Sequence, residues 1–170
     1  SVHIYTSGDT GNENFKITNE NNDGFEIIVD SDSIVKMATF GASQGVAIGK
    51  STNIDTSSSV AIGYLASATG NTRVAIGGGG TYAHGLQATA MGGSAKSERQ
   101  GAITLGYNAQ VRTAGSYGIA IGYSSQANNW DCIAIGRSTV ASGNGSIMLG
   151  HLTTNSTSDS FALGWNGTIS

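Results

Sequence analysis

The chain has 170 residues, 26 glycines, no proline and a single cysteine, and only 11% of its residues are charged. The aliphatic content of the chain argues against disorder. No apolar run is long enough to span a membrane, and the single Cys132 cannot form a disulfide within the chain. A net charge of −3 disfavours nucleic acid as a partner. From the charge and the lack of a long apolar run, we expect neither nucleic-acid binding nor membrane insertion.

The first forty residues form a distinct, acidic segment. Residues 1–40 carry a net charge of −5, whereas residues 41–170 carry +2. Within the first segment, "FKIT" and "FEIIVD" alternate as strands around the turn "NENNDG", which predicts a β-hairpin. We therefore divide the chain into an N-terminal β-hairpin or shaft-like segment, 1–40, and a second domain, 41–170. Since there is no initial methionine and no visible signal peptide, we expect the chain to be cut from a longer protein.

A five-residue motif recurs nine times in the second domain. It reads "GVAIG" at 45–49, "SVAIG" at 59–63 and "CIAIG" at 132–136, each time closing on a glycine. The closing glycines are spaced by 14, 14, 15, 14, 16, 14, 14 and 14 residues: Gly49, Gly63, Gly77, Gly92, Gly106, Gly122, Gly136, Gly150 and Gly164. Such a short, nearly fixed period indicates a solenoid.

Each repeat predicts two short strands. Large and small residues alternate within the motif, and a weaker alternation follows three and five residues after each glycine, as at Ala66 and Ala68. Stacked coils would form two parallel sheets face to face, with a spacing of about 4.8 Å per coil and a total length of about 40 Å. The glycines would supply a positive φ at the turns, and the absence of proline preserves the ladder donors.

We expect the large residues of the motif to fill the core of the roll. The small residues between them would then form a flat face that packs closely against another chain: Ala47, Ala61, Ala75, Ala90, Ala120, Ala134 and Ala162. Two columns of large residues make a thin core for a monomer, and we therefore predict self-association.

The repeats "SVAIGYLASATG" (59–70) and "CIAIGRSTVASG" (132–143) resemble the YadA-like head repeats of trimeric autotransporter adhesins, over about residues 41–166. The resemblance implies an all-β fold, in which three chains pack side by side as left-handed parallel β-rolls of nine coils, and a role in attachment to surfaces. The N-terminal segment is also similar to bacteriophage tail-fibre shafts, and predatory bacteria use the same fibre plan.

We therefore expect a non-enzymatic, homotrimeric fibre head that adheres to a host or prey cell through multivalent contacts with a glycan or protein receptor. The expected location is extracellular, on a bacterial cell surface or, alternatively, on a phage tail fibre. The alternative function is a structural spacer within a long fibre, with recognition elsewhere. The sequence has no G-x-S-x-G, H-E-x-x-H or C-x-x-C motif, and we expect no catalytic residues, bound metal or cofactor.

Candidate ligand-binding residues lie where the repeat is irregular. Tyr82 and His84 lie in the 15-residue coil, and Arg112 and Tyr117 lie in the 16-residue coil. Insertions in a solenoid map to loops on one face, which is often the binding face. Trp130 occupies a turn column that holds mostly small or polar residues in other coils. A tryptophan there indicates either a ligand contact or a cap over the seam with a neighbouring chain.

The residues that follow the closing glycines form an edge row rich in aromatic and cationic side chains: Lys50, Tyr64, Gly78, Gly93, Tyr107, Tyr123, Arg137, His151 and Trp165. Such a row suits sugars or acidic polymers, but it can also cover the turns and shield the core. We favour the second interpretation. Cys132 falls in a column of small residues, and we interpret it as a packing residue.

Overall fold

The structure, a computed structural model, describes residues 13–18, 24–29, 45–54, 58–112 and 116–169. The chain divides into two compact units, Ser1–Met37 and Ala38–Ser170. The boundary that the sequence places after residue 40 lies outside the described residues.

The first unit contains one antiparallel strand pair. Strand β1 (Glu13–Thr18) pairs with β2 (Gly24–Val29), with Glu13 opposite Val29 and Thr18 opposite Gly24. This is the pairing that the alternation in "FKIT" and "FEIIVD" predicts. The residues between the two strands, 19–23, lie outside the described part of the chain.

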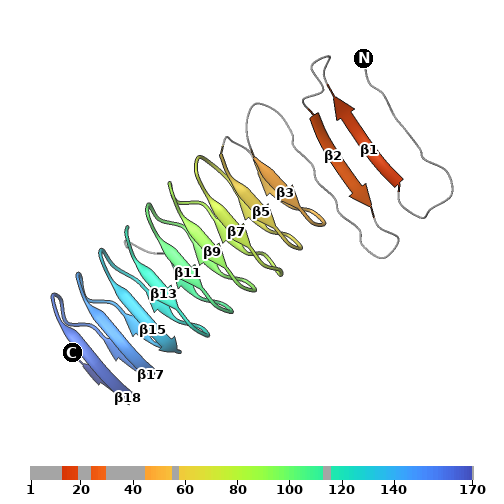
Figure 1. The fold of residues 1–170 in the computed structure, drawn as a ribbon. Coiled ribbons are helices and arrows are strands. Elements are labelled where there is room, and N and C mark those ends of the chain that lie inside the picture. Colours follow the sequence, from red (N-terminus) through yellow and green to blue (C-terminus); the bar gives the residue numbers. More distant parts are fainter. Residues whose placement is uncertain (1–12, 19–23, 30–44, 55–57, 113–115, 170) are drawn as a thin grey trace. The chain divides into compact units, whose positions relative to one another are not determined.

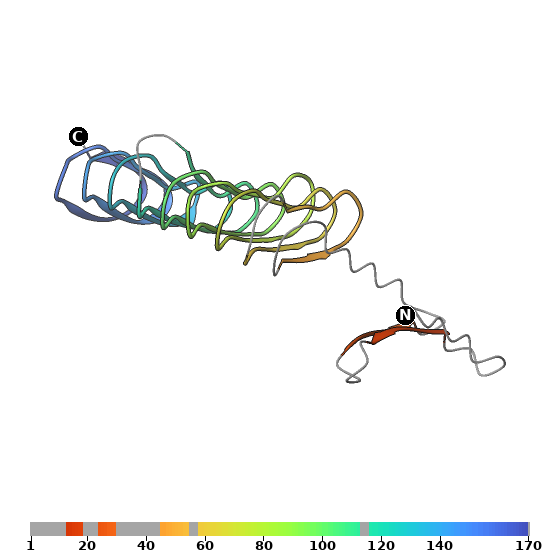
Figure 2. The same ribbon diagram turned by 90° about the horizontal axis from the view of Figure 1, so that it is seen from above.

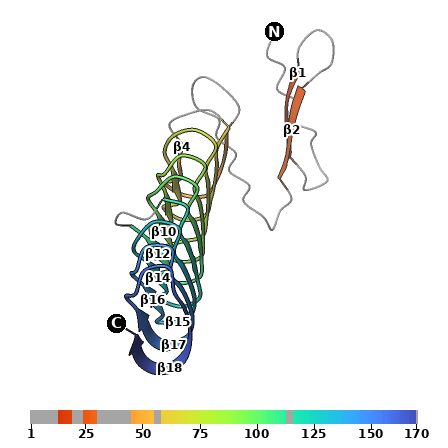
Figure 3. The same cartoon turned by 90° about the vertical axis from the view of Figure 1, so that its left-hand side faces the viewer.

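The second unit is a roll of parallel strands. The motif strands lie side by side in one row (Figure 1): β3 (Val46–Ile48), β5 (Val60–Ile62), β7 (Val74–Ile76), β9 (Thr89–Met91), β11 (Ile103–Leu105), β13 (Ile119–Ile121) and β15 (Ile133–Arg137). The shorter strands form a second row (Figure 3): β4 (Asn53–Ile54), β6 (Ser67–Ala68), β8 (Tyr82–Ala83), β10 (Lys96–Ser97), β12 (Gln110–Val111), β14 (Gln126–Ala127) and β16 (Val140–Ala141). Strand β17 (Ile147–Asn155) joins both rows, and β18 (Phe161–Ile169) pairs with β17.

Each motif strand pairs in parallel with its equivalents in the adjacent coils, so equivalent residues lie in rows along the roll. The register survives the two longer coils, because Ile76 still pairs with Met91 and Leu105 still pairs with Ile121. Figure 2 shows the coils as flattened rings, one behind another. The nine motif copies wind through eight full turns from Gly49 to Gly164. The predicted parallel β-roll is therefore confirmed.

Each motif strand buries the side that we expected to face another chain and exposes the side that we expected to fill the core. Side chains expected to form a face toward another chain are buried inside the roll of a single chain, at 0–7% exposure: Ala47, Ala61, Ala75, Ala90, Ala120, Ala134 and Ala162. The large residues that alternate with them point outward, and Ile103 is 36% exposed. The predicted packing role of these alanines is wrong, because the short turns bring the two rows of strands so close that mostly small side chains fit between them, and Met148 is the large exception in the alanine row.

The narrow interior also holds polar side chains, most of which are bonded to a nearby backbone carbonyl, whereas the Thr153 hydroxyl has no partner among the described residues. The Ser59 hydroxyl donates to the carbonyl of Gly70 at 2.6 Å, and the Ser97 hydroxyl donates to that of Ala102 at 2.8 Å. The Cys132 thiol is buried and lies 2.9 Å from the carbonyl oxygen of Gly143. Cys132 is therefore a packing residue inside its own chain.

The closing glycines are required by backbone conformation and by space. Gly49 has a φ of 130°, a region that is essentially restricted to glycine. A Cβ atom built on Gly49 would lie 2.5 Å from the carbonyl oxygen of Gly63 in the next coil. The same clash with the following glycine recurs along the column, as at Gly106 against Gly122. The glycine column therefore allows the coils to approach one another closely.

We predict that Gly106→Ala destabilises the roll by roughly 3 kcal/mol, because it adds backbone strain and a clash with Gly122. The matched control is Gly78→Ala, where a Cβ meets nothing within 4 Å and φ is not positive. We expect the control to change the stability by less than about 1 kcal/mol. Chemical denaturation of both variants measures the difference, and equal stabilities would contradict the steric explanation.

Candidate functional site: a polar groove on the outer face of the second strand row

The two outer faces of the roll differ in chemistry. The face formed by the motif strands presents two rows of large apolar side chains, which are half-buried or exposed, up to 66% for Leu163. The face formed by the shorter strands presents mostly polar side chains at its outward positions: Asn53, Ser67, Tyr82, Lys96, Gln110, Gln126, Val140 and Thr154. A single chain therefore has one apolar and one polar face.

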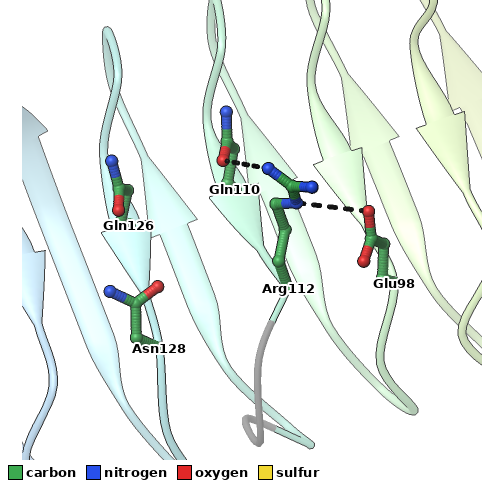
Figure 4. Close-up of a pocket in the computed structure, with 5 residues that line it drawn as sticks. All are labelled: Glu98, Gln110, Arg112, Gln126 and Asn128. Atoms are coloured by element: carbon green, nitrogen blue, oxygen red, sulfur yellow. Dashed lines mark hydrogen bonds and ion pairs between the residues drawn. The ribbon is translucent and has the colours of Figure 1, made fainter.

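The polar face contains a groove of about 360 Å³. Side chains from three successive coils line it: Glu98, Gln110, Arg112, Gln126 and Asn128. Gln110 and Gln126 are paired residues of β12 and β14 and lie next to one another in the ladder. Figure 4 shows the five side chains standing on this face of the roll. The volume lies within the range of about 300–1,000 Å³ that is usual for small-molecule sites.

A chain of contacts holds one end of the groove in place. Nε of Arg112 lies 3.3 Å from Oε1 of Glu98, and Nη1 of Arg112 lies 3.4 Å from Oε1 of Gln110 (Figure 4). The Gln110 amide nitrogen donates to Oδ1 of Asn108 at 2.6 Å. Asn108 in turn donates to the hydroxyl of Ser124 at 3.3 Å. The guanidinium and the first amide therefore have fixed orientations before any ligand arrives.

The side-chain amide of Gln126 differs from that of Gln110, because it makes no hydrogen bond within the part of the chain that the structure describes. Gln126 is only partly exposed and faces the groove from β14. A glutamine amide offers both an acceptor oxygen and a two-hydrogen donor. Gln126 can therefore give both kinds of hydrogen bond to a ligand without breaking one in the protein.

Arg112 is the one predicted site residue that lines the groove. Tyr82 and His84 belong to the same face, in the coil that precedes Lys96 and Glu98. Their rings stack, with centroids 5.4 Å apart and planes inclined by 19°. The structure thus places three of the five predicted residues on one face, along a line that leads into the groove.

Trp130 and Tyr117 lie elsewhere, in the turns that precede the motif strands. Trp130 is 49% exposed, and its carbonyl accepts a hydrogen bond from the backbone nitrogen of Gly145 at 2.9 Å. Tyr117 is 51% exposed, and its ring lies against Gly101 of the preceding coil. Neither residue lines the groove, so their predicted ligand contacts stay predictions.

The edge row after the glycines forms stacks of rings. Tyr107 and Tyr123 stack at 5.4 Å, and the Arg137 guanidinium lies 6.0 Å from the centroid of the Tyr123 ring. His151 and Trp165 are 4.3 Å apart. Each of these rings contacts a neighbour in the row, while Tyr107, Tyr123 and Trp165 stay 57%, 53% and 78% exposed, so the shielding role stays a prediction.

Sequence reasoning missed four residues of the groove, namely Glu98, Gln110, Gln126 and Asn128. The available signal was weak. Long polar side chains occupy the outward positions of the short strands in three consecutive coils, around the 16-residue coil. Each of these positions taken alone looks like an ordinary solvated strand residue.

Among the residues that the structure describes, no group of three or more His, Cys, Asp or Glu side chains is arranged to hold a metal ion. The same part of the chain contains no helix with the length and apolar character needed to cross a membrane.

Stacked parallel coils, an interior of small residues and a glycine at the end of each motif strand define a β-roll repeat domain. The family model of the YadA head domain repeat (2 copies) matches residues 57–79, 83–109 and 133–151. The roll is therefore a YadA-like head repeat domain, and domains of this family are structural modules of adhesins rather than enzymes. No curated protein matches the chain.

We predict that Glu98→Gln changes the free energy of unfolding by less than about 1 kcal/mol, because an exposed ion pair contributes little. The side chains of Arg112 and Glu98 are 47% and 29% exposed, respectively. Thermal denaturation at low and high salt tests this. A larger loss, or a strong salt dependence of the unaltered protein that Glu98→Gln abolishes, would show that the pair stabilises the roll.

Proposed function

We propose that the chain is an extracellular, homotrimeric adhesin head that attaches to the surface of a host or prey cell by several equivalent receptor contacts. The observation that carries this proposal is the apolar outer face on a roll of YadA-like head repeats. The family of these heads is trimeric and adhesive, which supports the same conclusion. A bacterial cell surface is the location that fits this family, and a phage tail fibre is the alternative carrier.

The apolar face explains why the chain should associate. Its rows run through every coil and include Val46, Met91, Ile135 and Leu163, each more than a third exposed. Contiguous apolar surface on this scale is uncommon on a soluble monomer and marks an interaction surface. Packing this face against equivalent faces of two further chains would remove the apolar rows from water. The alanines cannot serve this purpose, because they already fill the interior.

The same arrangement would leave the polar face outward. The groove lies on the shorter strands, and the apolar rows lie on the motif strands. A trimer that buries the apolar faces would therefore present three equivalent grooves to solvent. Linked weak sites gain avidity by a factor of about 10²–10⁴ without any new contact. A trimer with three linked grooves can therefore adhere even though each shallow groove binds weakly.

We predict that the purified protein has a mass in light scattering of three times the 17.2 kDa chain. Ile121→Glu should reduce the mass toward that of one chain, because the carboxylate would be buried in the interface. Val140→Glu makes the same kind of change on the polar face and should keep the trimeric mass. Circular dichroism reports whether each variant keeps its strands. A monomeric unaltered protein, or an unchanged Ile121→Glu variant, would contradict the proposed interface.

We predict saturable binding of the labelled trimer to at least one type of bacterial or host cell, measured by flow cytometry. The Ile121→Glu variant should lose most of this binding, because a single chain lacks the avidity of three linked sites. The Val140→Glu variant should remain trimeric and therefore keep this avidity. The Trp130→Ala variant, tested in parallel, shows whether that exposed ring contributes. Failure to bind any cell surface would contradict the adhesive function and favour the alternative, a structural spacer within a fibre.

A further inference from the structure

The charges of the groove cancel. Glu98 and Arg112 form an ion pair at 3.3 Å, and the other three lining residues are neutral amides. An uncompensated cationic groove would select a polyanion, and an acidic groove would select a cation. The balanced lining fits a ligand that is polar but uncharged.

The hydrogen-bonding groups of the groove are mixed in the same way. Amide side chains present an acceptor oxygen beside a donor nitrogen, and the Glu98–Arg112 pair adds a carboxylate acceptor and guanidinium donors. A hydroxyl group both donates and accepts a hydrogen bond. A lining in which donors and acceptors alternate over a short distance therefore matches a ligand with many hydroxyls. Gln126 offers both functions without a partner among the described residues.

The groove also has direction. Its lining residues come from three successive coils, so it extends for about 10 Å along the stack at about 4.8 Å per coil. Beyond the groove, the row of Gln126 and Gln110 continues through Lys96, which adds one positive charge outside the balanced lining, to Tyr82, which stacks with His84. An elongated ligand could thus lie along polar rows and end beside a pair of rings, which pack well against the apolar C–H faces of a pyranose.

We infer that this groove binds a neutral glycan chain, laid along the roll from Gln126 and Asn128 toward Tyr82 and His84. The proposal rests on the adhesive function above and names the class of receptor, a hydroxyl-rich oligosaccharide in place of a protein. Arg112 and Gln110 are held by their own contacts and orient the hydroxyls, while Gln126 supplies a bidentate donor and acceptor. The edge row is a weaker candidate, because none of its residues lines the groove.

The test is a printed array of neutral hexose and N-acetylhexosamine oligosaccharides beside sialylated and sulfated ones, probed with the intact protein. The best neutral oligosaccharide is then titrated in free form by calorimetry, so that avidity does not hide a weakened site. Gln126→Ala should raise the Kd about tenfold and leave the thermal stability unchanged. The matched control, Gln100→Ala, removes an exposed glutamine from a turn outside the groove and should bind as the unaltered protein does.

Neutral-glycan binding that Gln126→Ala weakens and Gln100→Ala preserves would support the inference. Binding restricted to sialylated or sulfated glycans would overturn it, as would neutral-glycan binding that is insensitive to Gln126. If the protein binds cells but no glycan, the glycan assignment fails while the adhesive function stands. If it binds neither, both proposals fail together.

Discussion

The close approach of successive coils at the closing glycine is the constraint on which the roll depends. The backbone at Gly49 reaches a conformation reserved for glycine and passes so near to Gly63 that no Cβ could lie between them. The absence of a Cβ here lets the coils lie at the spacing that the parallel ladders require, and the ladders align equivalent residues. Each row of side chains, inside or outside, follows from the repetition of that one backbone approach, which is why the motif tolerates changes at other positions but always closes on glycine.

The narrowness of the roll determines the chemistry of its surface. Short turns leave room for alanine, serine and threonine inside, so the bulky members of the motif must lie outside. One face is then apolar and calls for partner chains, while the opposite face is free to carry polar groups. Folding and assembly thus use different faces of the same strands, and ligand contacts can be placed on the second row of strands without disturbing either.

Much of the fold was predictable from the sequence, but the inside of the roll was not. Period-two alternation shows that Val60 and Ile62 share a face and that Ala61 lies on the other; it does not say which face is buried. The usual preference for large core residues misled here, because the two rows of strands lie too close for them. The groove was only partly predictable. Arg112 was a predicted site residue because it lies in the longer coil. Gln110 and Gln126 are 16 residues apart in sequence and become neighbours in a site only when the coils are stacked.

The two longer coils have a consequence for how such domains can change. The 15-residue coil is longer between β7 and β8, the 16-residue coil is longer between β12 and β13, and the ladders on either side stay in register. The alignment of successive coils therefore depends on the strand residues and not on the length of the turns. The roll is therefore a modular frame, in which a turn can be lengthened or exchanged in one coil while every other coil keeps its alignment and its surface.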